Sequence, residues 1–465
     1  MPKLFVRVRD LRYWLCTALV CVWLPSVSTA TGESPMTSDA PEADALFDDS
    51  QLHDIWIHVN DRDWAQLREG YRENTYYPAD IEWQGHVVRN AGIRVRGRTS
   101  RSGQKPGLHV DFGRYVSGQR FLGLKSLDLD NLWQDPTMLR ERLAMLVFRR
   151  MGLPAPRESH ARMFVGSGRE FAGVYGVIEV IDKQFLGRHF NEDDGYLYQY
   201  HWQDPFGFAN PSSNLDWYAA RFEPRTHENE STSALFAPIR DLARAVEDAP
   251  VEQLEEALAP YLDLSTYIRH IAVDNVLSQP DGLVGNLGMS NFYLYRFEER
   301  TLAQMIVWDQ DLAFEDLELP APSKNFDINL LAQKIWASPE LRAMYLMALV
   351  DVTLSIGPPA GTPEVEEPSQ RQCPAPPGQP VCGWLEEEVS REYAQIREAA
   401  IADPRTPYGP EQFEEGIEFL KRFARERSRI VRHYVSQIDP GIVAASAVQP
   451  SGTLRTRSRQ VRRPE

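Results

Sequence analysis

Residues 271–314 read IAVDNVLSQPDGLVGNLGMSNFYLYRFEERTLAQMIVWDQDLAF. Helical spacing in the first residues gives way to a Gly-rich loop, and two apolar stretches typical of β-strands follow. Asp281 lies in the loop, Asn286 follows it by five residues, and Asp309 ends the second predicted strand. Phosphoryl transfer uses a carboxylate that orients a hydroxyl, together with an amide and a second carboxylate that hold a metal ion. The spacing therefore predicts that the chemistry of the chain is concentrated here.

Two other interpretations of these residues stay open. A DG pair such as Asp281-Gly282 commonly forms a turn that has no chemical role. Asp309 and Asp311, with Glu315 nearby, also have the spacing of ligands in a structural calcium site.

The composition is that of an acidic globular protein. The chain has 465 residues and a formal net charge of −16. This length allows up to about three domains. An acidic chain is not expected to bind nucleic acid or an anionic membrane surface, because both carry negative charge. The net charge does not exclude a metal–nucleotide substrate, whose binding depends on local charge.

The N-terminus has the pattern of an export signal. Residues 1–30 combine basic residues, a short apolar run and the small residues Ser28-Thr29-Ala30, which predicts a signal peptide. An uncleaved anchor is the alternative, and we expect no integral membrane domain after cleavage. The polar, acidic residues 31–47 predict a disordered linker. We therefore expect a protein that is secreted or held in the cell envelope, in the periplasm or outside the cell.

The cysteines fit the same compartment. Signal cleavage removes Cys16 and Cys21 and leaves Cys373 and Cys382, on a Pro-rich loop predicted at residues 357–384. In an exported chain, two such cysteines favour a disulfide. Two free thiols are the alternative.

Residues 48–181 predict a mostly β unit, because apolar and polar residues alternate in LHDIWIHVN, GIRVRG, GLHVDF and GVYGVIEVI. The stretch DPTMLRERLAMLVFRRMG predicts an amphipathic helix with Asp135 as its N-cap. The turn RTSRSGQ carries Arg98 and Arg101 beside glycines and serines, a composition suited to binding phosphate. A solvated hairpin turn is the alternative.

Residues 182–440 have mainly helical patterns, and the change from strand to helix near residue 181 suits a hinge between two lobes. The basic residues 441–465 predict a disordered tail.

Several separate blocks of this chain, taken in order, resemble the CotH (spore coat protein H) kinase family. They are GIRVRGRTSR, KPGLHVDF, FLGLKSLDL, LRERLAMLVFRRMGLPAPR, GVYGVIEVIDKQFL, VDNVLSQPDGLVGNLGMSNFYLYR and VWDQDLAF. The resemblance implies an α+β, atypical protein-kinase-like fold with a β-rich N-lobe and a mainly helical C-lobe. It also implies binding of ATP with Mg²⁺ or Mn²⁺, and a protein as the phosphate acceptor.

The resemblance also implies roles for individual residues. Asp281 matches the catalytic-loop Asp of the family, and Asn286 and Asp309 match its metal-holding residues. Lys105 lies in the block where a lysine reaches the nucleotide phosphates, and Glu141 is the candidate to pair with that lysine.

Lys125 and Glu179 are alternatives to Lys105 and Glu141. No G-x-G-x-x-G motif precedes Lys105, so the turn with Arg98 and Arg101 is expected to contribute to nucleotide binding.

The sequence thus predicts a protein kinase that transfers the ATP γ-phosphoryl group to Ser or Thr of a protein acceptor. Because little ATP is available outside the cytoplasm, a catalytically inactive pseudokinase scaffold in surface or coat assembly is the first alternative. A calcium-stabilised extracellular binding module is the second.

Overall fold

The computed structural model describes residues 40–203, 206–209, 211–321, 324–359, 373, 375 and 381–448. All described residues belong to one compact unit, Ala40–Glu465. The predicted signal peptide, residues 1–30, therefore lies outside the described residues.

The N-terminal part of this unit is a closed barrel of seven strands. Their spatial order is β1 (His53–Val59), β2 (Tyr77–Trp83), β3 (His86–Val95), β4 (Leu108–Asp111), β5 (Ser126–Asp130), β7 (Glu170–Ile178) and β6 (Glu158–Val165). Neighbours are antiparallel except β1 and β6, which are parallel. Side chains of β1 alternate as the sequence predicts, with Ile55, Ile57 and Val59 buried. Helix α2 (Asp61–Glu69) connects β1 to β2.

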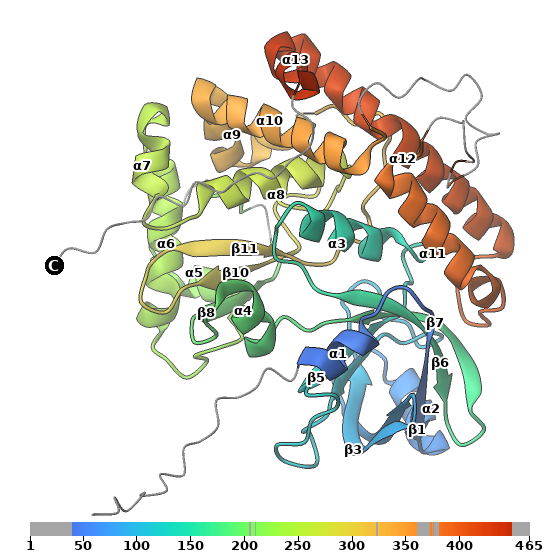
Figure 1. Ribbon diagram of the computed structural model, residues 1–465. Helices are drawn as coiled ribbons and strands as arrows, with labels where there is room; N and C mark the ends of the chain where they lie inside the picture. Colours follow the sequence, from blue (N-terminus) through green and yellow to red (C-terminus); the bar gives the residue numbers. More distant parts are fainter. Residues whose placement is uncertain are drawn as a thin grey trace, which may run out of the picture. The chain divides into compact units, whose positions relative to one another are not determined.

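Helix α3 (Arg140–Arg150) follows β5 and packs against both the barrel strand β6 and helix α8 (Leu264–Val276) (Figure 1). It begins later than the sequence predicts. The Asp135 carboxylate accepts hydrogen bonds from the backbone N–H of Thr137 and of Arg140, at 2.8 and 2.9 Å. These bonds fold residues 136–139 into a turn, so Asp135 organises the approach to α3 and is not its N-cap.

A second, four-stranded sheet follows, in the order β11 (Ala303–Val307), β10 (Phe292–Arg296), β8 (Tyr196–Tyr200) and β9 (Phe222–Pro224). Helix α4 (Lys183–Phe190) covers part of it, since Phe185 and Leu186 share a buried cluster with Tyr293, Tyr295 and Ile306. Asp182 caps α4 by accepting from the N–H of Gln184.

The C-terminal part is mainly helical, which agrees with the sequence. Its helices are α5 (Leu215–Ala219), α6 (Thr232–Asp248), η1 (Val251–Gln253), α7 (Leu254–Leu258), α8, η2 (Lys324–Ile328), α9 (Leu330–Ala337), α10 (Pro339–Ile356), α11 (Trp384–Ile401), α12 (Pro410–Ile438) and α13 (Pro440–Val448). Helix α8 is buried along almost its whole length, with α10 and α12 packed on it (Figure 1). None of the described helices is long and apolar enough to cross a membrane.

The two ends of the described chain differ from the prediction. Helix α1 (Ala40–Leu46) occupies part of the predicted linker 31–47, because Ala43, Leu46 and Phe47 are buried against the barrel core. Helix α13 likewise occupies the start of the predicted disordered tail 441–465, where Ile442 and Val443 pack against the helical core.

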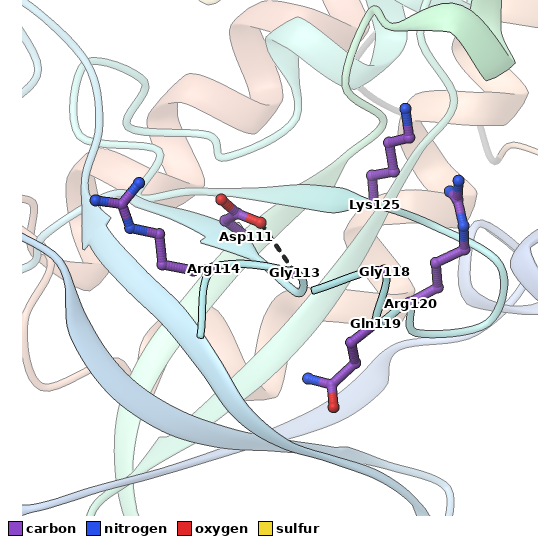
Figure 2. Close-up of a pocket in the computed structure, with 7 residues that line it drawn as sticks. All are labelled: Asp111, Gly113, Arg114, Gly118, Gln119, Arg120 and Lys125. Carbon is purple, nitrogen blue, oxygen red and sulfur yellow. Dashed lines mark hydrogen bonds between the residues drawn. The ribbon is translucent and has the colours of Figure 1, made fainter. Parts of the chain in front are cut away.

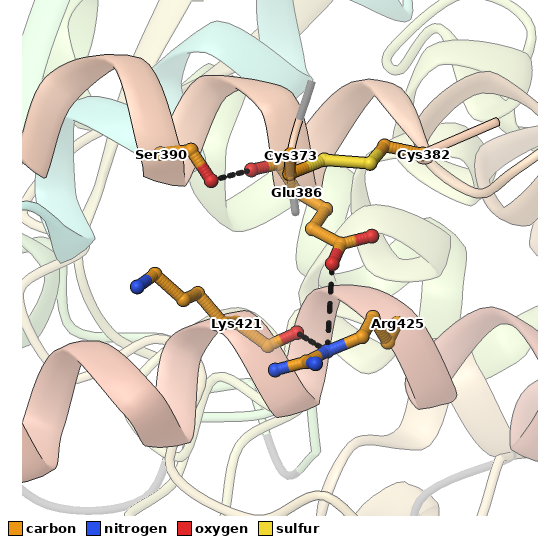
Figure 3. The surroundings of a disulfide bond; sticks show 6 residues. All are labelled: Cys373, Cys382, Glu386, Ser390, Lys421 and Arg425. Carbon is orange, nitrogen blue, oxygen red and sulfur yellow. Dashed lines mark hydrogen bonds and ion pairs between the residues drawn. A yellow bond between two sulfur atoms is a disulfide. The ribbon is translucent and has the colours of Figure 1, made fainter. Parts of the chain in front are cut away.

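The predicted disulfide between Cys373 and Cys382 is confirmed, with a Cα–Cα distance of 6.1 Å. It lies just before α11 (Figure 3). Below it, the Glu386 carboxylate of α11 lies 3.5 Å from the Arg425 guanidinium of α12. Most of the predicted 357–384 loop lies outside the described residues.

Candidate functional site

The loop between α8 and β10, residues 277–291, holds Asp281 in a compact conformation. The buried Asp274 carboxylate of α8 accepts a hydrogen bond from the N–H of Leu283 at 2.9 Å. A Cβ at Gly282 would lie 2.6 Å from that carboxylate, and a Cβ at Gly285 would lie 2.1 Å from the Pro280 carbonyl oxygen. Only glycine fits these two positions, so the Gly-rich sequence makes the tight loop possible.

The Asp281 side chain has polar partners at the end of the loop, Ser290 and Asn291. The Asn291 side-chain amide donates to Asp281 Oδ2 at 3.0 Å. Burial, and then repulsion from Asp309, raise the pKa of Asp281 to about 6. Asp281 and Asp309 are therefore close enough to interact electrostatically.

Strand pairing explains why these residues meet. Phe292 of β10 is paired with Val307 of β11, and the Trp308 N–H donates to the Asn291 carbonyl oxygen at 3.2 Å. Asp309, the next residue, has a φ of 51°, an uncommon conformation for a residue other than glycine. This conformation occurs two residues after the end of β11, where the chain leaves the sheet.

Further carboxylates surround Asp309. They are Asp311, Asp130 at the end of β5, and Glu141 in the first turn of α3. Burial and then repulsion from Asp130 raise the pKa of Asp309, while Arg96 and a hydrogen bond with Asp311 lower it. Burial and neighbouring carboxylates raise the pKa values of Glu141 and Asp311 well above normal. The cluster thus concentrates negative charge in a site largely removed from water.

Arg96 is the positive group within this cluster. It directly follows β3, and its guanidinium lies 3.1 Å from Asp128 Oδ2 and 2.5 Å from Asp130 Oδ2. Burial opposes its charge, but the carboxylates of Asp128 and Asp130 raise the pKa of Arg96 above its usual value. The guanidinium also stacks over the Trp308 ring, 5.7 Å from its centroid.

These donors suit a hard divalent cation. Asp281, Asn291 and Asp309 offer the carboxylate and amide oxygens that Mg²⁺ and Mn²⁺ prefer. Burial, and then repulsion from Asp130, raise the pKa of Asp309, and a bound cation would stabilise its charged form.

Cys373, Cys382 and Glu386 are the one group of three or more His, Cys, Asp or Glu ligand atoms within 4.8 Å of one another in the described chain. Both sulfurs of that group are in the disulfide, so it is not a metal site.

The structure adds Asn291 to the residues predicted for this loop. Asn286 is exposed, whereas Asn291 is half-buried and its side-chain amide donates to Asp281. The signal for Asn291 was its position directly before FYLYR, since two antiparallel neighbours bring the start of one strand beside the end of the next. Arg96, Asp130 and Asn291 were not identified from the sequence.

The structure does not bring Lys105 to Glu141. Lys105 is fully buried, and its Nζ lies 2.7 Å from Oδ2 of Asp403, in the connection between α11 and α12. The Lys105 ammonium also lies over the Tyr175 ring, 5.1 Å from the centroid. Glu141 instead lies within electrostatic range of Arg96.

The turn that carries Arg98 and Arg101 is held by local bonds. Arg101 donates to the carbonyls of Gly97, Tyr71 and Glu73 and to Asn74 Oδ1, so its guanidinium braces the turn against the chain after α2. This set of bonds gives Arg101 a structural role.

Arg98 is exposed and donates to the Trp202 carbonyl oxygen at 3.1 Å. Its guanidinium therefore reaches toward the end of β8, the neighbour of β10.

The two alternative residues lie elsewhere. Lys125 lines a pocket of about 330 Å³ at the β4–β5 connection, together with Asp111, Arg114 and Arg120 (Figure 2). Glu179 is buried between two guanidinium groups, those of Arg157 and Arg188 at 2.7 and 2.5 Å. Neither residue joins the cluster around Asp309.

Comparison with known proteins identifies a family to which the chain is similar. The model of the CotH kinase protein family matches residues 93–355. Inner spore coat protein H of Bacillus subtilis is 21% identical over 390 residues, which is 83% of this chain and 97% of that protein. Spore coat protein homolog 1 of Rhizopus delemar is 21% identical over 272 residues, or 56% of this chain and 41% of that protein.

Solved structures give weaker matches. The Helicobacter pylori proinflammatory kinase CtkA is 10% identical with a TM-score of 0.29, over 73% of this chain and 95% of that chain. The Shewanella oneidensis HipA–HipB toxin–antitoxin complex gives 10% identity and a TM-score of 0.29, over 68% and 61% of the chains. A TM-score of this size does not establish a common fold.

Proposed function

Because the chain belongs to the CotH kinase family, we propose that it is a protein kinase that transfers the γ-phosphoryl group of ATP to a Ser or Thr hydroxyl of a protein. In this proposal the barrel and α3 form the N-lobe of an atypical protein-kinase-like fold, and the second sheet with the helices forms the C-lobe. The observation that carries the proposal is the contact between Asp281 and Asn291, next to Asp309.

Each group has a proposed role. Asp281 accepts a hydrogen bond from the acceptor hydroxyl and orients it, and it takes the proton as the oxygen attacks phosphorus. Asn291 and Asp309 hold Mg²⁺ or Mn²⁺, which, when bound, offsets the charge of the nucleotide phosphates. We assign this role to Asn291 because its side chain bonds directly to Asp281, and Asn286 stays the residue predicted from the sequence.

Arg96 is the proposed contact to the phosphates. Its guanidinium lies beside Trp308, and so beside Asp309, whereas Lys105 is engaged by Asp403. The acidic partners Asp128 and Asp130 hold the guanidinium in place, and its planar set of donors matches phosphate oxygens.

A pseudokinase that binds nucleotide without transfer is the second candidate. The observation that favours it is the Lys105–Asp403 ion pair, which removes the lysine expected to reach the phosphates.

The location of the protein also bears on this alternative. The disulfide fits an oxidising compartment, and the Bacillus relative is named as an inner spore coat protein. We propose that this chain is likewise exported to the cell envelope or beyond.

One thermal-shift series distinguishes the candidates, because a ligand that binds only the folded state raises the melting temperature. ATP with Mg²⁺ or Mn²⁺ is expected to raise the melting temperature more than either component alone. A calcium-stabilised binding module instead responds to Ca²⁺ and is indifferent to ATP. An incubation with γ-labelled ATP then separates the kinase from the pseudokinase, since only the kinase transfers label to protein.

A further inference from the structure

We infer that Arg427 of α12 is a positioning residue that fixes the two loops carrying Asp281 and Asp309. The inference rests on the proposed function only for the roles assigned to those two aspartates. The contacts that carry it are independent of those roles.

Arg427 makes four hydrogen bonds to backbone carbonyl oxygens. Its side chain is fully buried. Two bonds go to the end of α8, from Nε to Val276 at 2.9 Å and from Nη2 to Asn275 at 2.7 Å. Two more go from Nη1 to Leu317 at 2.8 Å and to Leu319 at 2.7 Å. One guanidinium thus joins the chain before Asp281 to the chain after Asp309.

A cation is well suited to this place. The last carbonyls of a helix have no partner within the helix, and the C-terminal end of the helix carries partial negative charge. Burial lowers the pKa of Arg427 to about 10, so the group is still charged at neutral pH. Lysine would carry the charge but lacks the planar fork of donors that reaches two separate segments.

The two segments are also bonded to each other beside Arg427. The Phe314 N–H donates to the Leu277 carbonyl oxygen at 2.6 Å, and the Asp316 N–H donates to Ser278 Oγ at 3.1 Å. The Phe314 ring packs edge-on against Phe423 of α12, with centroids 5.3 Å apart. The loop of Asp281 and the segment after Asp309 therefore form one bonded unit on α12.

The replacement Arg427→Met tests this role, because it keeps an unbranched apolar stem and removes the guanidinium donor from four backbone carbonyls, three of them buried. Val431→Ala is the matched control. Val431 is fully buried on the same helix, but its side chain donates no hydrogen bond. Arg427→Lys is a milder variant for use if the methionine variant does not fold.

Hydrogen exchange on the full chain, read by peptide mass, measures the effect directly. Arg427→Met is expected to speed exchange in residues 277–291 and 309–319 by about tenfold beyond any change elsewhere, because opening there no longer breaks these bonds. Arg427→Lys is expected to give a smaller rise in the same peptides, and Val431→Ala an even rise across the helical part. An Arg427 variant that speeds exchange no more in these peptides than elsewhere overturns the inference.

The exchange result separates this inference from the proposed function. If the wild-type protein neither binds Mn²⁺–ATP nor transfers phosphate, the proposed function fails while local exchange still decides the role of Arg427. If the wild type is active, Arg427→Lys is expected to lower kcat and to raise KM for ATP, because it misplaces both Asp281, which orients the acceptor hydroxyl, and Asp309, which holds the metal. An unchanged kcat with unchanged local exchange contradicts the inference.

Discussion

Asn291 Nδ2 lies 3.0 Å from Asp281 Oδ2, which joins the two ends of a loop that contains Gly282, Gly285 and Gly288. Because Asn291 leads directly into β10, and β10 is paired with β11, this bond also links Asp281 to the strand end that carries Asp309. The position of Asp281 is thus fixed both by its own loop and by the sheet that contains β10 and β11.

The first prediction compares two asparagines on this loop. Asn291→Ala is expected to abolish most of the rise in melting temperature caused by Mn²⁺–ATP, because it removes an oxygen ligand and the donor that orients Asp281. Asn286→Ala, at an exposed position, is expected to keep that rise. If Asn286→Ala loses the rise and Asn291→Ala keeps it, then Asn286, the residue predicted from kinase spacing, holds the metal.

The second prediction concerns the buried pair of Lys105 and Asp403. Lys105→Met is expected to lower the free energy of unfolding by about 3–5 kcal/mol, because the Asp403 charge is left without its partner. Adding Asp403→Asn should recover part of this loss, since asparagine is uncharged, but not all of it, because its one oxygen cannot serve both the Val174 N–H and the N–H groups of Arg405 and Thr406. Urea titrations of the single and double variants give the comparison. A Lys105→Met protein of normal stability that no longer binds ATP would instead support a nucleotide contact.

The third prediction is a pH dependence that originates at Asp274. Burial raises the pKa of this carboxyl from 3.8 to about 7, and the neighbouring His270 is kept neutral because burial lowers its pKa to about 3. Between pH 3.8 and about pH 7, Asp274 is protonated in the folded state and ionised in the unfolded state. The contribution of Asp274 to stability therefore falls as pH rises from about 4 to about 7.

Asp274→Asn removes that titration and keeps an oxygen for the Leu283 N–H. Its free energy of unfolding, measured in urea at pH 5 and pH 8, is expected to fall less with pH than that of the wild type. Parallel profiles for the two proteins would rule out Asp274 as the source.

The fourth prediction concerns the disulfide. Replacing Cys373 and Cys382 with serine is expected to cost about 2–3 kcal/mol of stability, the value for closing a loop of this length. Thermal melts with and without a thiol reductant should show the same loss in the wild type. Transfer activity should not change, because the disulfide precedes α11 and makes no contact with the acidic cluster in the part of the chain that is described.

Much of the fold could be predicted because local patterns determine it. The alternation in HDIWIHV is that of a strand with one buried face, and β1 forms there. Asp281 and Asp309 could be associated because Asp281 lies in the loop that leads into the first apolar strand and Asp309 follows the second. The disulfide followed from export and from the spacing of Cys373 and Cys382.

The remaining site contacts depend on long-range packing. Lys105 meets Asp403 across almost 300 residues of sequence, and nothing near Lys105 signals that partner. Asn291 follows Asp281 by ten residues, outside the kinase spacing, and the compact Gly-rich loop brings it to Asp281. Helices α1 and α13 are too short to be stable alone and form where Leu46 and Ile442 pack against a core.

Asp281→Asn tests the central claim most directly. The replacement keeps the size and hydrogen-bonding shape of the side chain but removes its ability to accept a proton. Purified wild type and variant should be compared for Mn²⁺–ATP affinity and for transfer of γ-labelled phosphate to themselves or to an added acceptor protein. The account predicts similar nucleotide affinity and a loss of transfer of about a hundredfold or more. Equal transfer by the two proteins would contradict it.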